Sequence, residues 1–179
     1  DEFEDASLIV LKDPRICRFL PFWSGLLEDV GYRVKVICPL RSPVEVATSL
    51  AARNDMRLEE GGRLWLRHVL DAERSSRELP RHFVHWRAFL GGWRDQVRQI
   101  DTKLGLGLHL DHLDQPSPVD EFLSPELVRQ TTSDIDLHPW TTHAWDCLSG
   151  LVNFSHDSAI QDNLDELRWK FDEACSLFP

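Results

Sequence analysis

Arg41, Ser49 and Arg53 are spaced so that two cations and a hydroxyl could surround one anion. Arg41 follows the apolar run 34–40, which is typical of a strand buried on both faces. Ser49 and Arg53 belong to a helix predicted at 43–54, and residues four apart lie on one side of a helix. Because α/β proteins bind ligands beyond the carboxyl ends of their strands, this pattern predicts an anion-binding crevice. The same residues could instead be a strand-end charge, a surface hydroxyl and a favourable C-terminal cation.

The start of this predicted helix carries the residues of a capping box. Ser42 suits the N-cap, Pro43 suits the first helical position, and Glu45 stands three residues after the cap. At 100° per residue, Glu45 shares one stripe of the helix with Ser49 and Arg53. We therefore expect a strand end, a helix N-terminus and a polar stripe to face the same crevice.

Composition narrows the class of protein. A chain of 179 residues suits one domain with its own core, and its formal net charge of −10 argues against a general nucleic-acid or membrane-surface binder. Basic residues nevertheless outnumber acidic ones between residues 12 and 53. The sequence contains no apolar stretch of membrane-spanning length and opens with no signal segment, which predicts a cytoplasmic protein. Four cysteines without a CxxC pair favour reduced thiols, and a start without methionine suggests a piece of a longer protein.

The order of elements predicts an α/β fold with a mostly parallel sheet flanked by helices. The expected elements are strand 7–11, helix 15–30, strand 33–40, helix 43–54, helix 59–79, strand 81–86 and helix 89–104. A loop-rich part with a helical turn near 119–123 follows, and then helices 139–151 and 157–178. We interpret the chain as a single domain, 1–179, with an α/β core at 7–104, a loop-rich part at 105–138 and C-terminal helices at 139–179.

Three segments carry a family resemblance: Lys12-Asp13-Pro14-Arg15 after the first predicted strand, the run 40–53, and the stretch 64–84. They resemble bacterial sulfotransferases that use 3′-phosphoadenosine 5′-phosphosulfate. The resemblance covers about residues 7–100 and implies a P-loop-type fold that is incomplete at its N-terminus. It implies that Arg41, Ser49 and Arg53 bind the 3′-phosphate of the cofactor. It also implies that Lys12 stabilises charge on the transferred sulfuryl group and on the bridging oxygen that it leaves.

The resemblance also shows which parts of a complete site are not in the chain. Pro14 stands where many cytosolic relatives have a histidine base, and relatives with Lys-Asp-Pro take a carboxylate base from an earlier segment. The glycine-rich loop that cradles the 5′-phosphosulfate would also precede Asp1. Trp86 stands where the family often has a tyrosine that contacts adenine, so its indole could stack on the base or belong to the core. Arg15 is a weaker candidate for the acceptor side.

These observations lead to two hypotheses about function. The first is a sulfotransferase that moves a sulfuryl group to an acceptor hydroxyl, which by analogy belongs to a carbohydrate or a lipid-linked molecule. This chain would carry the half of the cofactor site that binds the 3′-phosphate, and no metal would be needed. The alternative is a truncated or degenerate non-catalytic relative that binds nucleotides or other proteins. A zinc site at His109, Asp111, His112 and Asp114 is disfavoured, because no second cluster at standard spacing completes it.

Overall fold

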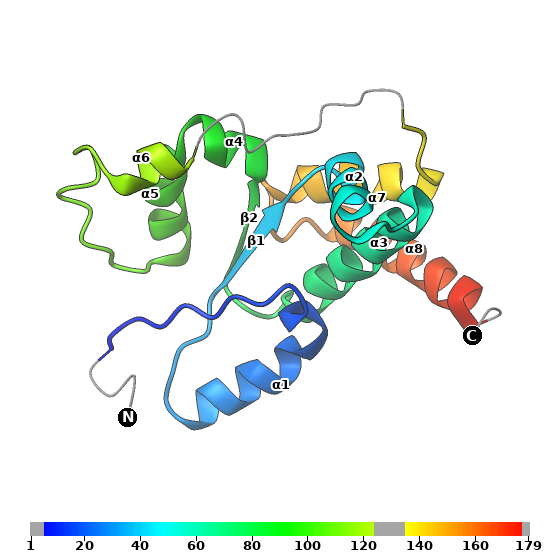
Figure 1. Cartoon of the computed structure of the whole chain (residues 1–179). Coiled ribbons are helices and arrows are strands. Elements are labelled where there is room, and N and C mark those ends of the chain that lie inside the picture. The colour runs from blue at the N-terminus through cyan, green and yellow to red at the C-terminus, as the bar shows by residue number, and fades with distance from the viewer. Residues whose placement is uncertain (1–5, 124–134, 177–179) are drawn as a thin grey trace.

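The computed structural model describes residues 6–123 and 135–176, which form an α/β fold (Figure 1). The elements are α1 (Ile16–Asp29), β1 (Val36–Leu40), α2 (Pro43–Asn54), α3 (Leu58–Ser75), β2 (Arg81–His85), α4 (Trp86–Gly91), α5 (Trp93–Leu104), α6 (Pro118–Phe122), α7 (Pro139–Leu151) and α8 (Ser158–Ser176). β1 and β2 pair in parallel, with Val36 opposite Arg81 and Leu40 opposite His85. The predicted parallel sheet flanked by helices is confirmed, but within the described residues the sheet has two strands.

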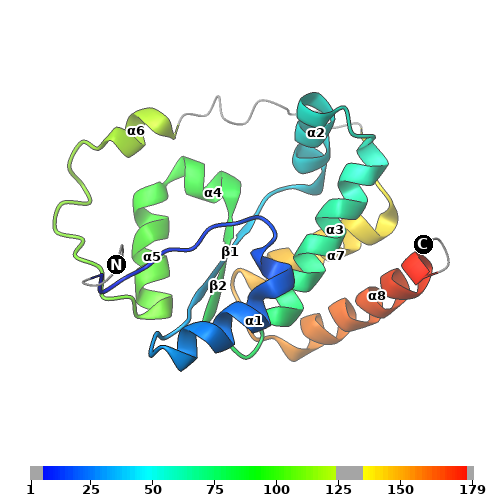
Figure 2. The same cartoon turned by 60° about the horizontal axis from the view of Figure 1, so that its bottom comes forward.

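The prediction of a strand at 7–11 is wrong. The segment forms no ladder with β1 or β2 and runs across the sheet to α1 in both views (Figures 1 and 2). Most of its side chains are exposed, Leu8 at 50% and Val10 at 78%. A strand requires a hydrogen-bonding neighbour along its length, and an apolar, β-branched composition does not supply one.

The two faces of the sheet pack against different helices. Phe83 on β2 faces the main core, which β1, α3, α7 and α8 build together (Figure 1). The buried members of this core are Cys38, Leu40, Trp65, Leu66, Leu70, Phe83, Ala144, Leu148, Leu151, Leu164, Leu167 and Phe171. The next residue, Val84, points to the opposite face and packs with Ile100 and Leu104 of α5, as the alternation of side chains along a strand requires. On the second face of β1, Ile37 is exposed.

The predicted helix 89–104 is two helices. Gly92 interrupts it with φ −165° and ψ 58°, because adjacent glycines have the weakest helix propensity apart from proline. The predicted turn near 119–123 is confirmed as α6, which begins with a capping box between Ser117 and Asp120. The predicted helices 139–151 and 157–178 are confirmed as α7 and α8, while residues 124–134 of the predicted loop lie outside the described part.

Helices α2 and α3 approach closely at a glycine. A Cβ atom added at Gly61 would lie 2.8 Å from the Cα of Ala47, so only glycine permits this distance. The indole of Trp65 on α3 donates a hydrogen bond of 3.0 Å to the backbone carbonyl of Arg41. Together these contacts hold the end of β1 and the start of α2 against α3.

A buried ion-pair network closes the amino end of β2. The Arg81 side chain is fully buried; its Nη2 lies 3.2 Å from Oε1 of Glu73, and it donates at 2.8 Å to the carbonyl of Ser155. Arg77 adds a 2.7 Å ion pair with Glu73 and a 2.6 Å ion pair with Asp165 of α8. The network therefore ties α3, β2 and α8 together at the edge of the sheet opposite to the end that carries Arg41.

Candidate functional site

The carboxyl ends of β1 and β2 bring two arginines to the same edge of the sheet. Leu40 and His85 are paired in the register, so Arg41 and the segment Trp86-Arg87 leave adjacent strands at the same level. Helix α2 begins two residues after Arg41, and its N-terminus adds a positive end to this edge. Two cations and a helix start thus converge where α/β proteins bind ligands.

Glu45 connects the two arginines. Its carboxylate is buried at 3% exposure and accepts from Nε of Arg41 at 3.2 Å and from Nε of Arg87 at 2.6 Å. A buried carboxylate is stable only when it is paired and hydrogen-bonded, and these two guanidinium groups meet that need. The predicted capping box is wrong: Ser42 is the N-cap residue, but its side chain makes no capping hydrogen bond, and the Glu45 carboxylate pairs with the arginines instead.

The charge balance of this edge favours an anion. One carboxylate against two guanidinium groups leaves a formal charge of +1, and both cations remain open to solvent, with side-chain exposures of 32% for Arg41 and 61% for Arg87. Among the described residues, Arg41 uses only Nε for a side-chain hydrogen bond. Its two terminal nitrogens carry four more N–H donors, which suit the oxygens of a phosphate or sulfate.

Ser49 and Arg53 continue the stripe along α2 away from this edge. Ser49 is half-buried one turn beyond Glu45. Arg53 is exposed in the last turn, where its Nε donates at 2.9 Å to the side chain of Asn54. A rise of 1.5 Å per residue puts Arg53 about 12 Å along the helix axis from Glu45. The structure thus brings Ser49 nearer to the paired arginines than Arg53.

Trp86 opens α4 beside Arg87. Its ring stacks on Phe89, with centroids 6.4 Å apart and an interplanar angle of 7°. The indole N–H of Trp86 is buried and finds no hydrogen-bond partner within residues 6–123 and 135–176. Trp86 therefore lies at the candidate edge with one polar atom unsatisfied.

Lys12 and Arg15 lie in the segment that precedes α1. Both are exposed, and Arg15 forms an ion pair of 2.9 Å with Asp13. The start of α1 is attached to Asp71 near the far end of α3, through a 3.4 Å ion pair from Arg18. Asp71 is about 15 Å along α3 from Gly61, where α2 makes its close contact. The segment with Lys12 is therefore anchored near the C-terminal end of α3, whereas the carbonyl of Arg41 is hydrogen-bonded to Trp65, about 9 Å along the helix toward its N-terminus.

Arg87 is the member of this edge that sequence reasoning did not identify. Arg87 is 42 residues from Glu45, and nothing local in the sequence connects them. The usable signal was that Arg87 directly follows the predicted strand 81–86, just as Arg41 directly follows the predicted strand 33–40. Parallel pairing of the two strands would have placed both cations together.

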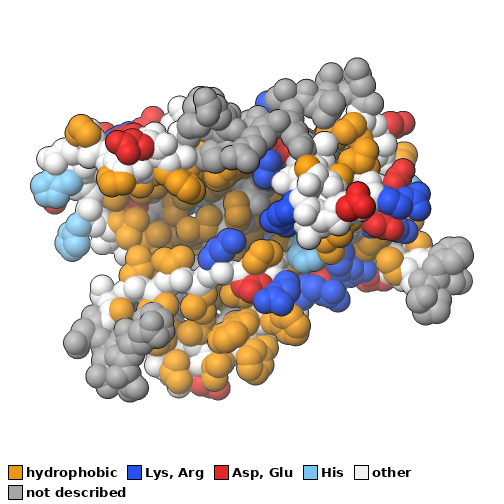
Figure 3. Space-filling view, viewed as in Figure 1, with side chains coloured by type: hydrophobic (Ala, Val, Ile, Leu, Met, Phe, Trp, Pro, Cys, Tyr) orange, Lys and Arg blue, Asp and Glu red, His pale blue; other side chains and the backbone are white. Residues whose placement is uncertain are grey.

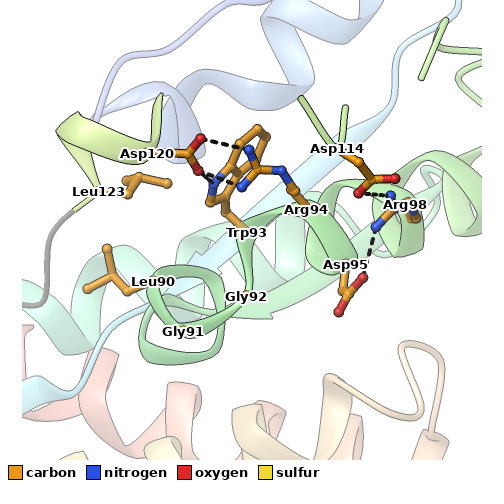
Figure 4. Close-up of a pocket in the computed structure, with 10 residues that line it drawn as sticks. All are labelled: Leu90, Gly91, Gly92, Trp93, Arg94, Asp95, Arg98, Asp114, Asp120 and Leu123. Carbon is orange, nitrogen blue, oxygen red and sulfur yellow. Dashed lines mark hydrogen bonds and ion pairs between the residues drawn. The ribbon is translucent and has the colours of Figure 1, made fainter. Parts of the chain in front are cut away.

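A hollow of about 480 Å³ lies elsewhere, between α5, the start of α6 and the loop that joins them (Figure 4). Its two arginines already have partners: Arg94 forms a two-point ion pair with Asp120, and Arg98 contacts Asp114 at 2.5 Å and Asp95 at 2.9 Å. Hydrogen bonds from Arg94, and then from Trp93, hold the pKa of Asp120 well below its usual range. With three carboxylates against two guanidinium groups, this hollow suits an anion less well than the Arg41 edge does.

The described residues contain no group of three or more His, Cys, Asp and Glu side chains arranged to hold a metal ion. His109 and His112 lie exposed in the loop after α5. In the same part of the chain, no helix has the length and apolar character needed to cross a bilayer. Comparisons of the chain with protein-family models, curated proteins and solved structures found no significant match.

Proposed function

We propose that the Arg41 edge binds the 3′-phosphate of 3′-phosphoadenosine 5′-phosphosulfate and that the complete protein is a sulfotransferase. The observation that carries this proposal is the pair of guanidinium groups that buried Glu45 holds at the carboxyl ends of β1 and β2. Because their orientation is set before a ligand arrives, binding a phosphate costs little side-chain entropy. Arg41 supplies the donors, Ser49 adds a hydroxyl from the next turn, and Arg53 contributes longer-range attraction.

The proposal assigns further roles to residues beside this edge. Trp86 lies one residue from Arg87, so an adenine that follows the anchored phosphate can stack on its ring. In the transfer, the bond between sulfur and the bridging oxygen breaks while a new bond forms between sulfur and the acceptor oxygen. The acceptor hydroxyl gives its proton to a base, and adenosine 3′,5′-bisphosphate leaves.

The alternative of a binding module without transfer is favoured by one observation. Lys12, which the sulfotransferase hypothesis needs beside the sulfuryl group, lies in an exposed segment that is not a strand. Binding of the 3′-phosphate does not require Lys12, whereas transfer does. Binding and transfer are therefore tested separately.

The experiment for binding is calorimetric titration with adenosine 3′,5′-bisphosphate. Arg41→Ala removes one charge-assisted phosphate contact, of about 1.5–3 kcal/mol, so Kd should rise roughly ten- to hundred-fold. Arg57→Ala is the matched control, because Arg57 is exposed, 75% at its side chain, and makes only a 3.7 Å ion pair with Glu59. Equal affinities of the two variants would refute the anchor. Binding without transfer from the phosphosulfate to any hydroxyl acceptor would favour the alternative.

A further inference from the structure

Helix α1 carries apolar residues on two opposite sides. Cys17 and Leu20 are buried on the side that packs against α3. On the other side, four large side chains at helical spacing form what we call the α1 stripe. Its members are Phe19, Phe22, Trp23 and Leu26.

The α1 stripe is exposed over its whole length. Exposure is 58% for Phe19, 65% for Phe22, 37% for Trp23 and 44% for Leu26. At 100° per residue these positions fall within an arc of roughly 100°. The space-filling view shows hydrophobic side chains gathered over α1 at the lower edge of the molecule (Figure 3). A helix that is apolar on both sides is usually covered on both sides.

The area of the α1 stripe fits a protein interface. With about 200 Å² for each fully exposed aromatic side chain, the stripe presents roughly 350 Å² of apolar surface. A standard interface buries about 800 Å² per partner, of which about 450–500 Å² is apolar. The stripe alone therefore supplies about three quarters of the apolar area that one partner needs, and its aromatic residues are of the types enriched in such interfaces.

The charges beside the stripe indicate the partner. Arg18 at the start of α1 and Asp29 at its end lie on the same flank of the stripe, next to Phe22. When two identical helices pack antiparallel about a two-fold axis, the same flank of each helix lies beside that of the other. The start of one helix then lies beside the end of its partner. With the two-fold axis between Trp23 and Ser24, Arg18 of each copy faces Asp29 of the other, because these two residues are equidistant from that axis in sequence.

We propose that two copies of this chain dock through antiparallel contact of their α1 stripes, with reciprocal Arg18–Asp29 ion pairs at the rim. Arg18 is more than half exposed even though it lies 3.4 Å from Asp71, and Asp71 keeps a closer partner in Arg168 at 2.8 Å. Arg18 can therefore turn toward a second copy without leaving a buried carboxylate unpaired. This dimer is independent of the anion site, because Arg41, Glu45 and Arg87 do not belong to α1.

The test is sedimentation equilibrium of the whole 179-residue chain and its variants. The wild type should approach twice its 20.7 kDa mass at concentrations of about 10–100 μM. Asp29→Arg turns both rim pairs into repulsions and should weaken the dimer about tenfold. Combining it with Arg18→Glu should restore the wild-type affinity. Glu28→Arg is the control, since Glu28 is also exposed but points away from the stripe.

Phe22→Asp gives an independent test of the apolar contact. Phe22 is exposed in the single chain, so this variant should fold with an unchanged circular dichroism spectrum and sediment as a monomer. A wild type that stays monomeric would overturn the proposal, whatever then covers the stripe. So would equal effects of Asp29→Arg and Glu28→Arg, or failure of the double swap to restore association.

Discussion

Replacing Glu45 by glutamine should weaken the fold and strengthen phosphate binding at the same time. Glutamine keeps the shape of the side chain but removes the charge that Arg41 and Arg87 share. Each charge-assisted hydrogen bond to a carboxylate is worth about 1.5–3 kcal/mol, and solvent screening at two partly exposed arginines reduces that. We therefore expect a loss of about 1–2 kcal/mol in the free energy of unfolding, or a fall in Tm of about 2–8 °C.

The gain in binding follows from Coulomb's law. A phosphate dianion held by Arg41 would lie roughly 6 Å from the carboxylate of Glu45, and at the dielectric constant of water their repulsion is about 1.4 kcal/mol. The amide oxygen of glutamine can still accept from one guanidinium group and keep part of its orientation, so removing the carboxylate charge should tighten binding of adenosine 3′,5′-bisphosphate by up to about tenfold. Stability and affinity thus change in opposite directions, which loss of the folded state could not produce.

Guanidinium chloride unfolding measures the first effect, and calorimetric titration at low ionic strength measures the second. Glu59→Gln is the control, because Glu59 is exposed and its contact with Arg57 is 3.7 Å long, so neither quantity should change. Unchanged stability of Glu45→Gln would show that the ion pairs do not form in solution. Weaker or equal phosphate affinity would show that the anion does not bind beside Glu45.

Two further predictions concern the folded state. Arg81→Ala removes a fully buried cation from Glu73 and should cost about 3 kcal/mol in equilibrium unfolding, whereas Arg98→Ala, at an exposed ion pair, should cost much less. Equal costs would contradict the buried network. Burial, assisted by Lys103, lowers the pKa of His82 below its value of about 6.5 in the unfolded chain. The unfolded chain therefore binds the proton first, and stability falls as pH drops below about 6.5, by at most about 1.4 kcal/mol per pH unit for this group. His82→Gln should lose less stability between pH 7.5 and 5.5, and an identical loss would contradict the assignment.

Much of the secondary structure could be predicted from local pattern. The strand before Arg41, the helix with Pro43 at its first position and the helices of the C-terminal part all occur as expected. Each depends on periodicity and on start or stop residues that lie within one element. The prediction of a strand at 7–11 was wrong because a strand needs more than a local pattern. The composition of this segment suits a strand, but its hydrogen-bonding partner would have to come from elsewhere in the structure.

In the candidate site, too, the position of a residue within its own element could be predicted, but its contacts with other elements could not. Arg41 was expected at a strand end and lies there, and Ser49 was expected one turn beyond Glu45 and lies there as well. The capping role of Glu45 could not be judged from the sequence, because two kinds of donor compete for its carboxylate: the backbone N–H of Ser42 and the guanidinium groups of the arginines. Arg87, which decides that competition, reaches Glu45 only after β1 and β2 have paired.

The sequence by itself determined where most of the helices lie and which residues share a stripe, because neighbours along one element are fixed by its 3.6- or 2-residue period. Only the tertiary structure decided which charges meet. It placed Arg87 on Glu45 and kept both guanidinium groups at the edge of the sheet, but it left Lys12 in an exposed segment that is not a strand. It also left the α1 stripe uncovered, since burial depends on which elements pack together and no local period specifies that.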